Sequence, residues 1–369
     1  MPAHEVAILA DDLTGALDAA APFASEARPV VVVWGERAPP AAAGFALDSE
    51  TRELPLRRAE AIVDRLLPYL ADGRIALKKV DSLLRGNTLG ELAACWKGGI
   101  FRSLVFAPAF PAQDRVTRNG TQFARIAGEW RPVAEDLAAG LRRYGLASRR
   151  LARSEPPAGD GLFVCDAESD ADLASIAGGI GHLAEPVLWC GSAGLARALA
   201  GEGSGGIELG GERRLAVVGT RHPVTGGQTA ALEAAFPESI IAVATIADAA
   251  GASDRVAGLL DRHGAAALVF RLPPLAPAEA AAIASRTFQA LRAVAAPDLL
   301  VATGGETLVR LCGALAATRL DAIGEWRPGV PVARMADGAW SGTTLVSKSG
   351  AFGTPDVLTA LFTCGTATH

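Results

Sequence analysis

Two adjacent acids lie directly behind the first apolar segment of the chain and are its first candidates for chemistry. Asp11 and Asp12 follow residues 6–9, a short run rich in branched side chains that is typical of a buried strand, and precede Thr14 and Gly15. In an open α/β sheet, a loop at the carboxyl end of a strand faces the crevice in which ligands bind. One such residue is enough to cap the following helix. A pair of carboxylates therefore favours a ligand or catalytic site over the alternative of capping.

Cations and hydrogen-bonding groups occupy other loops in the first half of the chain. The charged members are Arg52, Lys78, Lys79, Asp81, Arg85 and Arg115, and the neutral members are Ser49, Ser82 and Asn87. Because Arg can hold a carboxylate through two parallel hydrogen bonds, and Asp and Asn bind sugar hydroxyls, the set predicts a small polyhydroxylated acid as ligand. The alternative is a solvated edge of charges. We adopt it for Lys78 alone, since strand alternation directs Lys78 and Lys79 to opposite faces.

Three glycine-containing segments of the second half have the features of anion-binding loops. They are GTRH at 219–222, TGGET at 303–307 and KSGAFG at 348–353. The first two lie between a predicted strand and a predicted helix, where free backbone N–H groups and the helix dipole favour phosphate. Each segment alone could be an ordinary tight connection. Three in one domain predict a nucleotide site, which is not of the P-loop class because G-x-x-x-x-G-K-[ST] is absent from the sequence.

The elements that must position these groups alternate between short apolar strands and helices. Strands are predicted at 6–9, 30–33, 74–77, 104–107, 162–165, 187–190, 215–219, 240–244, 266–270, 299–302 and 345–347. Helices are predicted at 56–70, 88–96 and 277–295, and a loop at 108–120. This alternation predicts an α/β protein whose mainly parallel sheets are covered by helices.

A glycine-dense segment, GEGSGGIELGG at 201–211, interrupts this pattern and predicts a linker. The expected division is a first domain at 1–200, a linker at 201–212 and a second domain at 213–369. Gly201, Gly203 and Gly206 match the dinucleotide fingerprint. That motif must follow a strand and open a helix, whereas here it follows a predicted helix, so we discount it.

The composition is that of a globular chain and excludes several classes of function. Of 369 residues, 50% are hydrophobic and 20% charged, and the formal net charge is -5. The absence of a long Lys/Arg cluster argues against general nucleic-acid binding, and no apolar run approaches the roughly 18 residues of a membrane span. Because the N-terminal residues lack the basic start and apolar core of a signal peptide, we expect a cytoplasmic protein. No metal-ligand spacing is present, and reduced thiols are expected at Cys95, Cys165, Cys190, Cys312 and Cys364.

Taken together, the motifs resemble the four-carbon acid sugar kinases, and the matching segments run in order along almost the whole chain. They are ADDLTGALD (10–18), SETR (49–52), KKVDSLLRGN (78–87), APAFPAQDR (107–115), RNG (118–120), GSAGLA (191–196), GTRHPVTGGQ (219–228), TGGETL (303–308), PGVP (328–331) and KSGAFGTPDVL (348–358). The resemblance implies an N-terminal domain that binds the sugar acid, a C-terminal domain that binds ATP, and an active site in the cleft between them. It also implies phosphorylation of a hydroxyl of threonate, erythronate or an oxo-tetronate.

On this basis the expected activity is that of an ATP- and Mg²⁺-dependent sugar-acid kinase. Asp12 is the expected general base, with Asp81 as the alternative. The acid is expected on Arg52, Lys79 and Arg85, with Asp11, Thr14, Ser49, Ser82, Asn87 and Arg115 completing its site. The expected ATP-binding residues are Thr220, Gly304, Gly305, Glu306, Thr307, Lys348, Gly350 and Gly353. A two-domain hydroxy-acid dehydrogenase, a non-catalytic binding protein and self-association into a homo-oligomer are left open.

Overall fold

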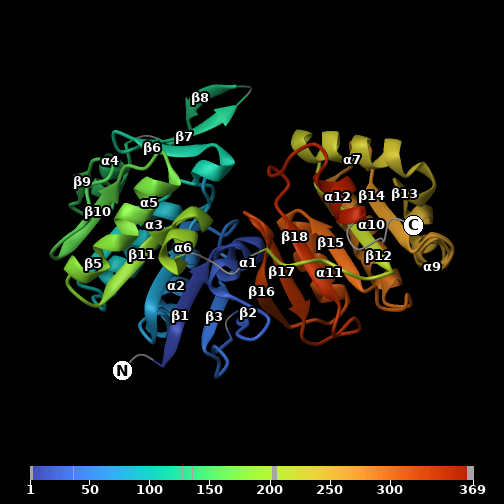
Figure 1. Ribbon diagram of the computed structural model, residues 1–369, viewed down its shortest axis with the longest axis horizontal. Helices are drawn as coiled ribbons and strands as arrows, with labels where there is room; N and C mark the ends of the chain where they lie inside the picture. The colour runs from blue at the N-terminus through green and yellow to red at the C-terminus, as the bar shows by residue number, and fades with distance from the viewer. Residues whose placement is uncertain (1–2, 36, 127, 135, 202–205, 364–369) are drawn as a thin grey trace. The chain divides into compact units, whose positions relative to one another are not determined.

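The computed structural model describes residues 3–35, 37–126, 128–134, 136–201 and 206–363. The chain divides into two compact units, Met1–Gly205 and Gly206–His369 (Figure 1). Each unit is built on a parallel sheet with helices packed against it, which confirms the predicted α/β class. Residues 202–205 of the predicted linker, Cys364 and His369 lie outside the described residues.

The first unit contains a parallel sheet and a small antiparallel one. The parallel sheet has the order β2-β3-β1-β4-β11-β5-β10-β9, and the antiparallel sheet has the order β6-β7-β8. The strands are β1 (His4–Ala10), β2 (Val30–Trp34), β3 (Gly44–Asp48), β4 (Gly73–Lys79), β5 (Ser103–Ala107), β6 (Arg115–Arg118), β7 (Thr121–Ile126), β8 (Glu129–Pro132), β9 (Arg149–Leu151), β10 (Gly161–Cys165) and β11 (Val187–Gly191). The helices are α1 (Leu13–Ala20), α2 (Leu56–Leu70), α3 (Thr88–Lys97), α4 (Leu137–Arg142), α5 (Asp170–Gly178) and α6 (Ala193–Ala200).

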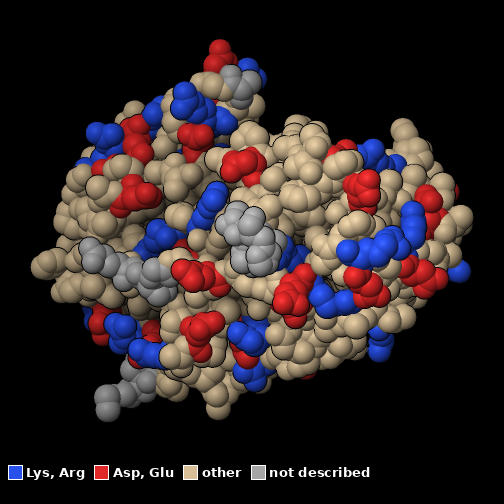
Figure 2. All heavy atoms as spheres, turned by 45° about the vertical axis from the view of Figure 1, so that its right-hand side comes forward, with Lys and Arg blue, Asp and Glu red and all other residues tan. Residues whose placement is uncertain are grey.

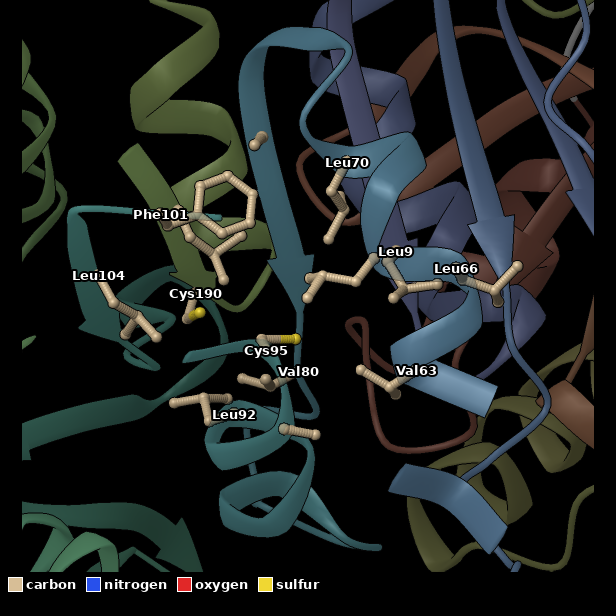
Figure 3. Packing of buried hydrophobic residues seen from close by; sticks show 14 of the residues in the cluster. Leu9, Val63, Leu66, Leu70, Val80, Leu92, Cys95, Phe101, Leu104 and Cys190 are labelled. Carbon is tan, nitrogen blue, oxygen red and sulfur yellow. The ribbon is translucent and has the colours of Figure 1, made fainter. Parts of the chain in front are cut away.

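The sequence of α2 shows how a helix of this unit meets the sheet. Its buried positions recur at helical spacing and carry Ala59, Ile62, Val63, Leu66, Leu67 and Leu70. They pack against apolar residues of the central strands and of α3, and Figure 3 shows this packing around Leu9 and Cys95. Burying each such aliphatic side chain stabilises the fold by about 1.5–3 kcal/mol. Burial of these apolar side chains thus holds the strands in place, and the polar loops follow the ends of those strands.

Five strands of the first unit, β3, β6, β7, β8 and β9, lie where the sequence pattern predicted none. β3 begins at Gly44, a residue that weakens strand propensity, but a Cβ there would lie 2.7 Å from Cγ1 of Val6. Glycine therefore lets β3 lie close against β1, which the local pattern does not reveal. The loop predicted at 108–120 contains β6, which pairs with β7 in the small sheet that extends beyond the main one (Figure 1).

The second unit has a parallel sheet extended by an antiparallel pair, in the order β13-β14-β12-β15-β18-β17-β16. The strands are β12 (Arg214–Val218), β13 (Ile240–Val243), β14 (Ala265–Phe270), β15 (Leu299–Thr303), β16 (Arg319–Arg327), β17 (Val330–Met335) and β18 (Thr344–Lys348). The helices are α7 (Pro223–Ala235), α8 (Ile246–Ala250), α9 (Ala252–His263), α10 (Pro277–Leu291), α11 (Gly305–Ala314) and α12 (Val357–Thr363). The predicted helix at 277–295 is thus confirmed but ends at Leu291.

The surface carries charges of both signs. Figure 2 shows acidic and basic side chains interspersed over the face in view. Within the described part of the chain, every helix is too short or too polar to cross a bilayer.

Candidate active site

The carboxyl ends of β1, β3 and β4 lie at one edge of the first sheet because these strands are parallel neighbours. Ala10 pairs with Asp48 across β1 and β3, and Leu9 pairs with Lys78 across β1 and β4. The loops that follow these strands carry most of the predicted substrate residues. The fold therefore brings residues 11–14, 49–52 and 79–87 to the edge where open α/β sheets bind ligands.

Arg52 lies at the centre of this edge and forms ion pairs with both acids of the first loop. Its Nε and Nη2 donate to the two carboxylate oxygens of Asp11 at 2.9 and 2.8 Å. Its Nη1 and Nη2 donate to the carboxylate of Asp12 at 2.5 and 2.8 Å. The side chain of Arg52 is only 14% exposed. The guanidinium that was expected to hold the substrate therefore already donates four hydrogen bonds to protein carboxylates.

Asp11 and Asp12 share the guanidinium of Arg52, but their pKa values shift in opposite directions. Burial raises the pKa of Asp11, but Arg52, with Lys78 and Lys79, outweighs burial and brings that pKa below its usual range. Burial is also the largest cause of the pKa shift of Asp12, and it raises that pKa. The positive charge of Arg52 lowers the pKa, the negative charge of Asp11 raises it further, and the net result is a raised pKa. Asp12 is thus the better proton acceptor of the pair. Its Oδ1 also accepts a hydrogen bond from Gly15 N at 2.9 Å, so it caps α1 as well.

Asp81 is held in a second ion pair, with Arg85 four residues later. Arg85 Nε and Nη2 donate to Asp81 Oδ2 and Oδ1 at 2.7 and 2.9 Å. Burial raises the pKa of Asp81, but hydrogen bonds from Arg85 and the charge of Arg52 outweigh it and hold that pKa far below the usual range. A carboxylate in this state is a weak base.

Lys79 is a buried cation at this edge, and it has no carboxylate partner in the described part of the chain. Only 5% of the residue is exposed, and its Nζ donates to the carbonyl of Val80 at 2.9 Å. A Cβ on Gly15 would lie 3.1 Å from Lys79 Nζ and 2.5 Å from Asp12 Oδ1, so glycine is needed where α1 begins. An unpaired ammonium therefore lies beside the first turn of α1, close to Asp12.

Lys78 was expected at a solvated edge, and that prediction is wrong. The residue is 1% exposed, and its Nζ lies 2.7 Å from Oε2 of Glu91, which is itself 2% exposed. β4 is a central strand that is covered on both faces, so alternation directs each of the two lysines into protein. Lys78 thus forms a buried ion pair with α3.

The neutral residues predicted for the site hold the loops in place. Ser49 Oγ donates to the carbonyl of Ala10 at 2.8 Å, which ties the loop after β3 to the end of β1. Asn87 Nδ2 donates to the carbonyl of Leu54 at 2.7 Å. By contrast, Thr14 Oγ1 is buried without a hydrogen-bond partner among the described residues. Thr14 therefore has a hydroxyl to offer a ligand.

Ser82 and Arg115 lie in neighbouring segments. Ser82 is buried, and its carbonyl accepts a hydrogen bond from Nε2 of Gln122 at 2.9 Å. Arg115 Nη1 donates to the carbonyls of Gln113 and Asp114, and burial lowers the pKa of its guanidinium. The bond from Gln122 connects the small antiparallel sheet to the loop after β4, whereas the bonds of Arg115 stay within its own loop.

Asp48 belongs to this edge but was not predicted from the sequence. It is 1% exposed; Oδ1 accepts from Glu50 N at 2.7 Å, and Oδ2 has no partner among the described residues. Burial raises its pKa well above the usual range, and the charges of Asp12, Glu50 and Asp11 add to this effect. Its place at the last position of a strand, directly before the SETR segment, was the signal that could have identified it.

The second unit contains a cavity of about 490 Å³ with a polar end and an apolar wall. The polar end is formed by Gly219, Thr220, Arg221, Gly304, Gly305, Glu306, Thr307 and Arg310. The apolar wall comes from the end of β14, the loop after it and α10, and is formed by Phe270, Leu272, Pro273, Leu275, Pro277, Ala280, Ala281, Ala284 and Phe288. A glycine-lined polar end beside an apolar wall suits a ligand with a phosphate tail and an aromatic base.

The three predicted anion-binding loops are in mutual contact because β12, β15 and β18 are neighbours in the sheet. Gly304 has a positive φ of 92°, and a Cβ there would lie 3.1 Å from Cβ of Thr220. A Cβ on Gly350 would lie 2.7 Å from Thr220 Oγ1. The loops can therefore pack this closely only with glycine at these positions. Lys348, Gly350 and Gly353 lie on the third loop and are not among the residues that line the cavity.

The acids of the second unit fit a magnesium ion that is bound mainly by phosphate. Among the described residues, no cluster of three or more His, Cys, Asp or Glu side chains could hold a metal. Glu306 is the acid that lines the cavity, and its Oε1 accepts from Nε and Nη2 of Arg310 at 3.0 and 2.8 Å. Mg²⁺ keeps several waters and binds through one or two carboxylates together with substrate phosphates.

Two family models match consecutive parts of the chain. The sugar-binding N-terminal domain matches residues 6–153 and 134–199, and the nucleotide-binding C-terminal domain matches residues 215–358. The chain is 32% identical over 408 residues to D-threonate kinase of Cupriavidus necator, with 95% of each chain covered. It is also 32% identical over 399 residues to D-threonate kinase of Bordetella bronchiseptica, covering 96% of this chain and 95% of that protein.

Two solved structures share the fold at lower identity. A Salmonella typhimurium LT2 protein matches with a TM-score of 0.74 and 20% identity, covering 95% of this chain and 97% of that one. A Haemophilus influenzae protein matches with a TM-score of 0.69 and 17% identity, covering 97% of this chain and 98% of that one. These structures support the fold, whereas the family models and the sequence relatives identify the family. The chain belongs to the four-carbon acid sugar kinase family.

Proposed function

We propose that this protein is an ATP-dependent kinase that phosphorylates a hydroxyl of a four-carbon sugar acid in carbohydrate catabolism. Threonate, erythronate and the oxo-tetronates are the proposed acceptors, supported by the relatives named D-threonate kinase. The first domain, residues 1–200, binds the acid, and the second, residues 213–369, binds ATP, with 201–212 as their linker. ATP as donor implies an ATP-containing compartment, for which we propose the cytoplasm.

Lys79 is the proposed partner of the substrate carboxylate. The observation that carries this assignment is a buried ammonium that has no carboxylate partner among the described residues and lies next to an acid of raised pKa. Leaving such a cation unpaired in a closed site is costly, so an anionic ligand is favoured over a neutral sugar. Thr14 Oγ1, which has no hydrogen-bond partner in the described part of the chain, is available for a substrate hydroxyl.

Asp12 is the proposed general base that receives the proton of the attacking hydroxyl. Its raised pKa suits that role, whereas the strongly lowered pKa of Asp81 does not. Arg52 pairs with Asp11 and Asp12, and Arg85 pairs with Asp81. These ion pairs favour a role for both arginines in orienting the carboxylates over the direct binding of substrate that the sequence suggested.

ATP is proposed to occupy the cavity of the second unit. Its base would lie on the apolar wall between β14 and α10, and its phosphates would lie at Thr220, Gly304, Gly305 and Thr307, with Arg221 and Arg310 as nearby cations. Glu306 and the phosphates would hold Mg²⁺, which neutralises the charge that the transferred group carries. Free backbone N–H groups at the start of α11 add to phosphate binding.

The test is ADP release by the full-length protein with ATP and Mg²⁺ on a panel of tetronates and oxo-tetronates. The matched controls are the neutral tetroses and tetritols of the same configuration. We expect turnover with one or more acids and none with their neutral counterparts. Equal kcat/KM for an acid and its neutral counterpart would exclude the carboxylate site but keep the kinase, whereas failure to bind ATP would overturn the proposed function.

A further inference from the structure

The loop that follows β18 is held by its carbonyl groups. Lys348 Nζ donates to the carbonyls of Ser349 and Phe352, both at 2.9 Å. From α7, Thr225 Oγ1 donates to the carbonyl of Gly350 at 2.7 Å. Gln228 Nε2 adds bonds to the carbonyls of Phe352, Gly353 and Thr354 at 3.0, 3.0 and 3.1 Å.

These bonds determine where the amides of the loop point. In a planar trans peptide, the C=O of one residue and the N–H of the next residue point in opposite directions. When the carbonyls of Ser349 and Gly350 turn toward Lys348 and Thr225, the N–H groups of Gly350 and Ala351 turn to the other side of the loop. Gly350 also lies against Thr220, which lines the polar end of the cavity. The loop thus has a carbonyl side toward Lys348 and an amide side suited to an anion.

The environment of Lys348 is that of a bound monovalent cation. The residue is fully buried, and its Nζ is surrounded by two carbonyl oxygens and, at 3.4 Å, by Thr225 Oγ1. In the described part of the chain it has no carboxylate partner, and burial alone lowers its pKa to about 8. Carbonyl and hydroxyl oxygens in such a ring replace the hydration shell of K⁺ in other proteins. Here an ammonium tethered to β18 takes that place.

We infer that Lys348 is a tethered cation that directs the amides of residues 350–351 toward the nucleotide phosphates without touching the nucleotide itself. It is therefore a positioning residue, in place of the direct ATP contact that the sequence suggested. This inference rests on the proposed function, because it takes the second unit as the ATP-binding part of the kinase. The loop would then owe its affinity for phosphate to the charge of Lys348, and it would need no bound monovalent cation such as K⁺.

The experiment removes the charge in two ways in the full-length protein. Lys348→Ala leaves space under the loop, and Lys348→Met fills that space with an uncharged side chain. We expect both to raise the Kd for MgATP by about tenfold or more, with the KM of the tetronate unchanged. Ammonium chloride is expected to restore binding to Lys348→Ala but not to Lys348→Met. Tetramethylammonium chloride at equal ionic strength, too large for the site, is expected to restore neither.

A second measurement separates positioning from direct contact with ATP. Without nucleotide, hydrogen exchange of the amides at 350–354 is expected to be faster in Lys348→Ala than in the wild type, and ammonium is expected to slow it. A residue that only contacts phosphate would leave exchange in the nucleotide-free protein unchanged, which would overturn the inference. Restoration by ammonium and tetramethylammonium alike would overturn it too, because that is a general salt effect.

Thr225→Val provides a test that does not depend on folding of the Lys348 variants. It removes a hydroxyl that bonds the Gly350 carbonyl and contacts Lys348 Nζ, while side-chain shape is kept. A rise of about threefold or more in the Kd for MgATP supports the inference, and an unchanged Kd contradicts it. If the wild type itself did not bind MgATP, the proposed function would fail. If the wild type and the variants bound it equally, only this inference would fail.

Discussion

Lys78 and Lys79 are consecutive residues of β4, yet only Lys78 has a carboxylate partner in the described structure. Lys78 Nζ lies 2.7 Å from Glu91 on α3, whereas Lys79 Nζ donates to the carbonyl of Val80 beside the first turn of α1. Strand alternation places one ammonium in the core and the other at the edge where the substrate is proposed to bind. Replacing each lysine by the same residue therefore separates stability from ligand binding.

Lys79→Met is expected to raise the KM of the tetronate by about tenfold or more, since the substrate carboxylate loses a buried charged partner. The KM of ATP should stay near its wild-type value because the nucleotide is proposed to bind the second domain. Steady-state ADP release with each substrate varied in turn measures both constants. An unchanged tetronate KM would remove Lys79 from the acid site.

Lys78→Met is expected to lower the free energy of unfolding by about 3–5 kcal/mol, because Glu91 is left as an unpaired buried carboxylate. Urea denaturation measures the loss. The double variant Lys78→Met/Glu91→Leu should recover much of it, since no charge is then buried without a partner. As a control, Arg131→Met breaks the exposed pair with Glu129 and should change stability by less than about 0.5 kcal/mol. Equal losses in the single and double Lys78 variants would contradict this explanation.

Asp12→Asn is expected to lower kcat by about 100-fold or more while binding of both substrates is retained. Asparagine keeps the shape and the cap on α1 but cannot accept the proton. Rapid-quench turnover together with equilibrium binding distinguishes lost chemistry from lost affinity. Near-normal kcat would transfer the role to Asp81 or remove the need for a base.

The pH dependence of kcat distinguishes the two candidate bases in the wild-type enzyme. A general base works when deprotonated, so kcat falls as the pH falls through its pKa. Because the pKa of Asp12 is raised, we expect this acid limb above the ordinary Asp value of about 3.9. The pKa of Asp81 is strongly lowered, so kcat without such a limb down to the pH of acid unfolding would favour Asp81.

Ala281→Trp is expected to raise the KM of ATP by about tenfold or more, because an indole would occupy the apolar wall of the 490 Å³ cavity. The matched control is Ala282→Trp on the same helix, where the side chain is exposed and does not line the cavity. The control should keep the wild-type KM. Equal effects of the two variants would indicate damage to α10 and not occupation of a nucleotide site.

Local sequence was sufficient to predict most of the parallel strands and the loops that carry chemistry, but it did not predict the antiparallel strands β6, β7, β8, β16 and β17. A strand of consecutive branched residues such as Val30–Trp34 has few other ways to bury its side chains, and α2 is defined by its helical spacing. Parallel pairing then puts the carboxyl ends of the parallel strands of a sheet at one edge. The positions of Asp11, Asp12, Lys79 and the three glycine loops could therefore be predicted.

Pairing of charges was decided only by the tertiary structure. Arg52 is 40 residues from Asp12 in sequence, and no periodicity predicts that its guanidinium pairs with both Asp11 and Asp12. Glu91 pairs with Lys78 across β4 and α3, and burial beside β1 raises the pKa of Asp48 well above its usual range. The sequence by itself determined which residues reach each site. Only the folded chain brings in the neighbours that decide the charge of these residues and their freedom to bind a ligand. The same holds for the two carbonyls and the hydroxyl that surround Lys348 Nζ.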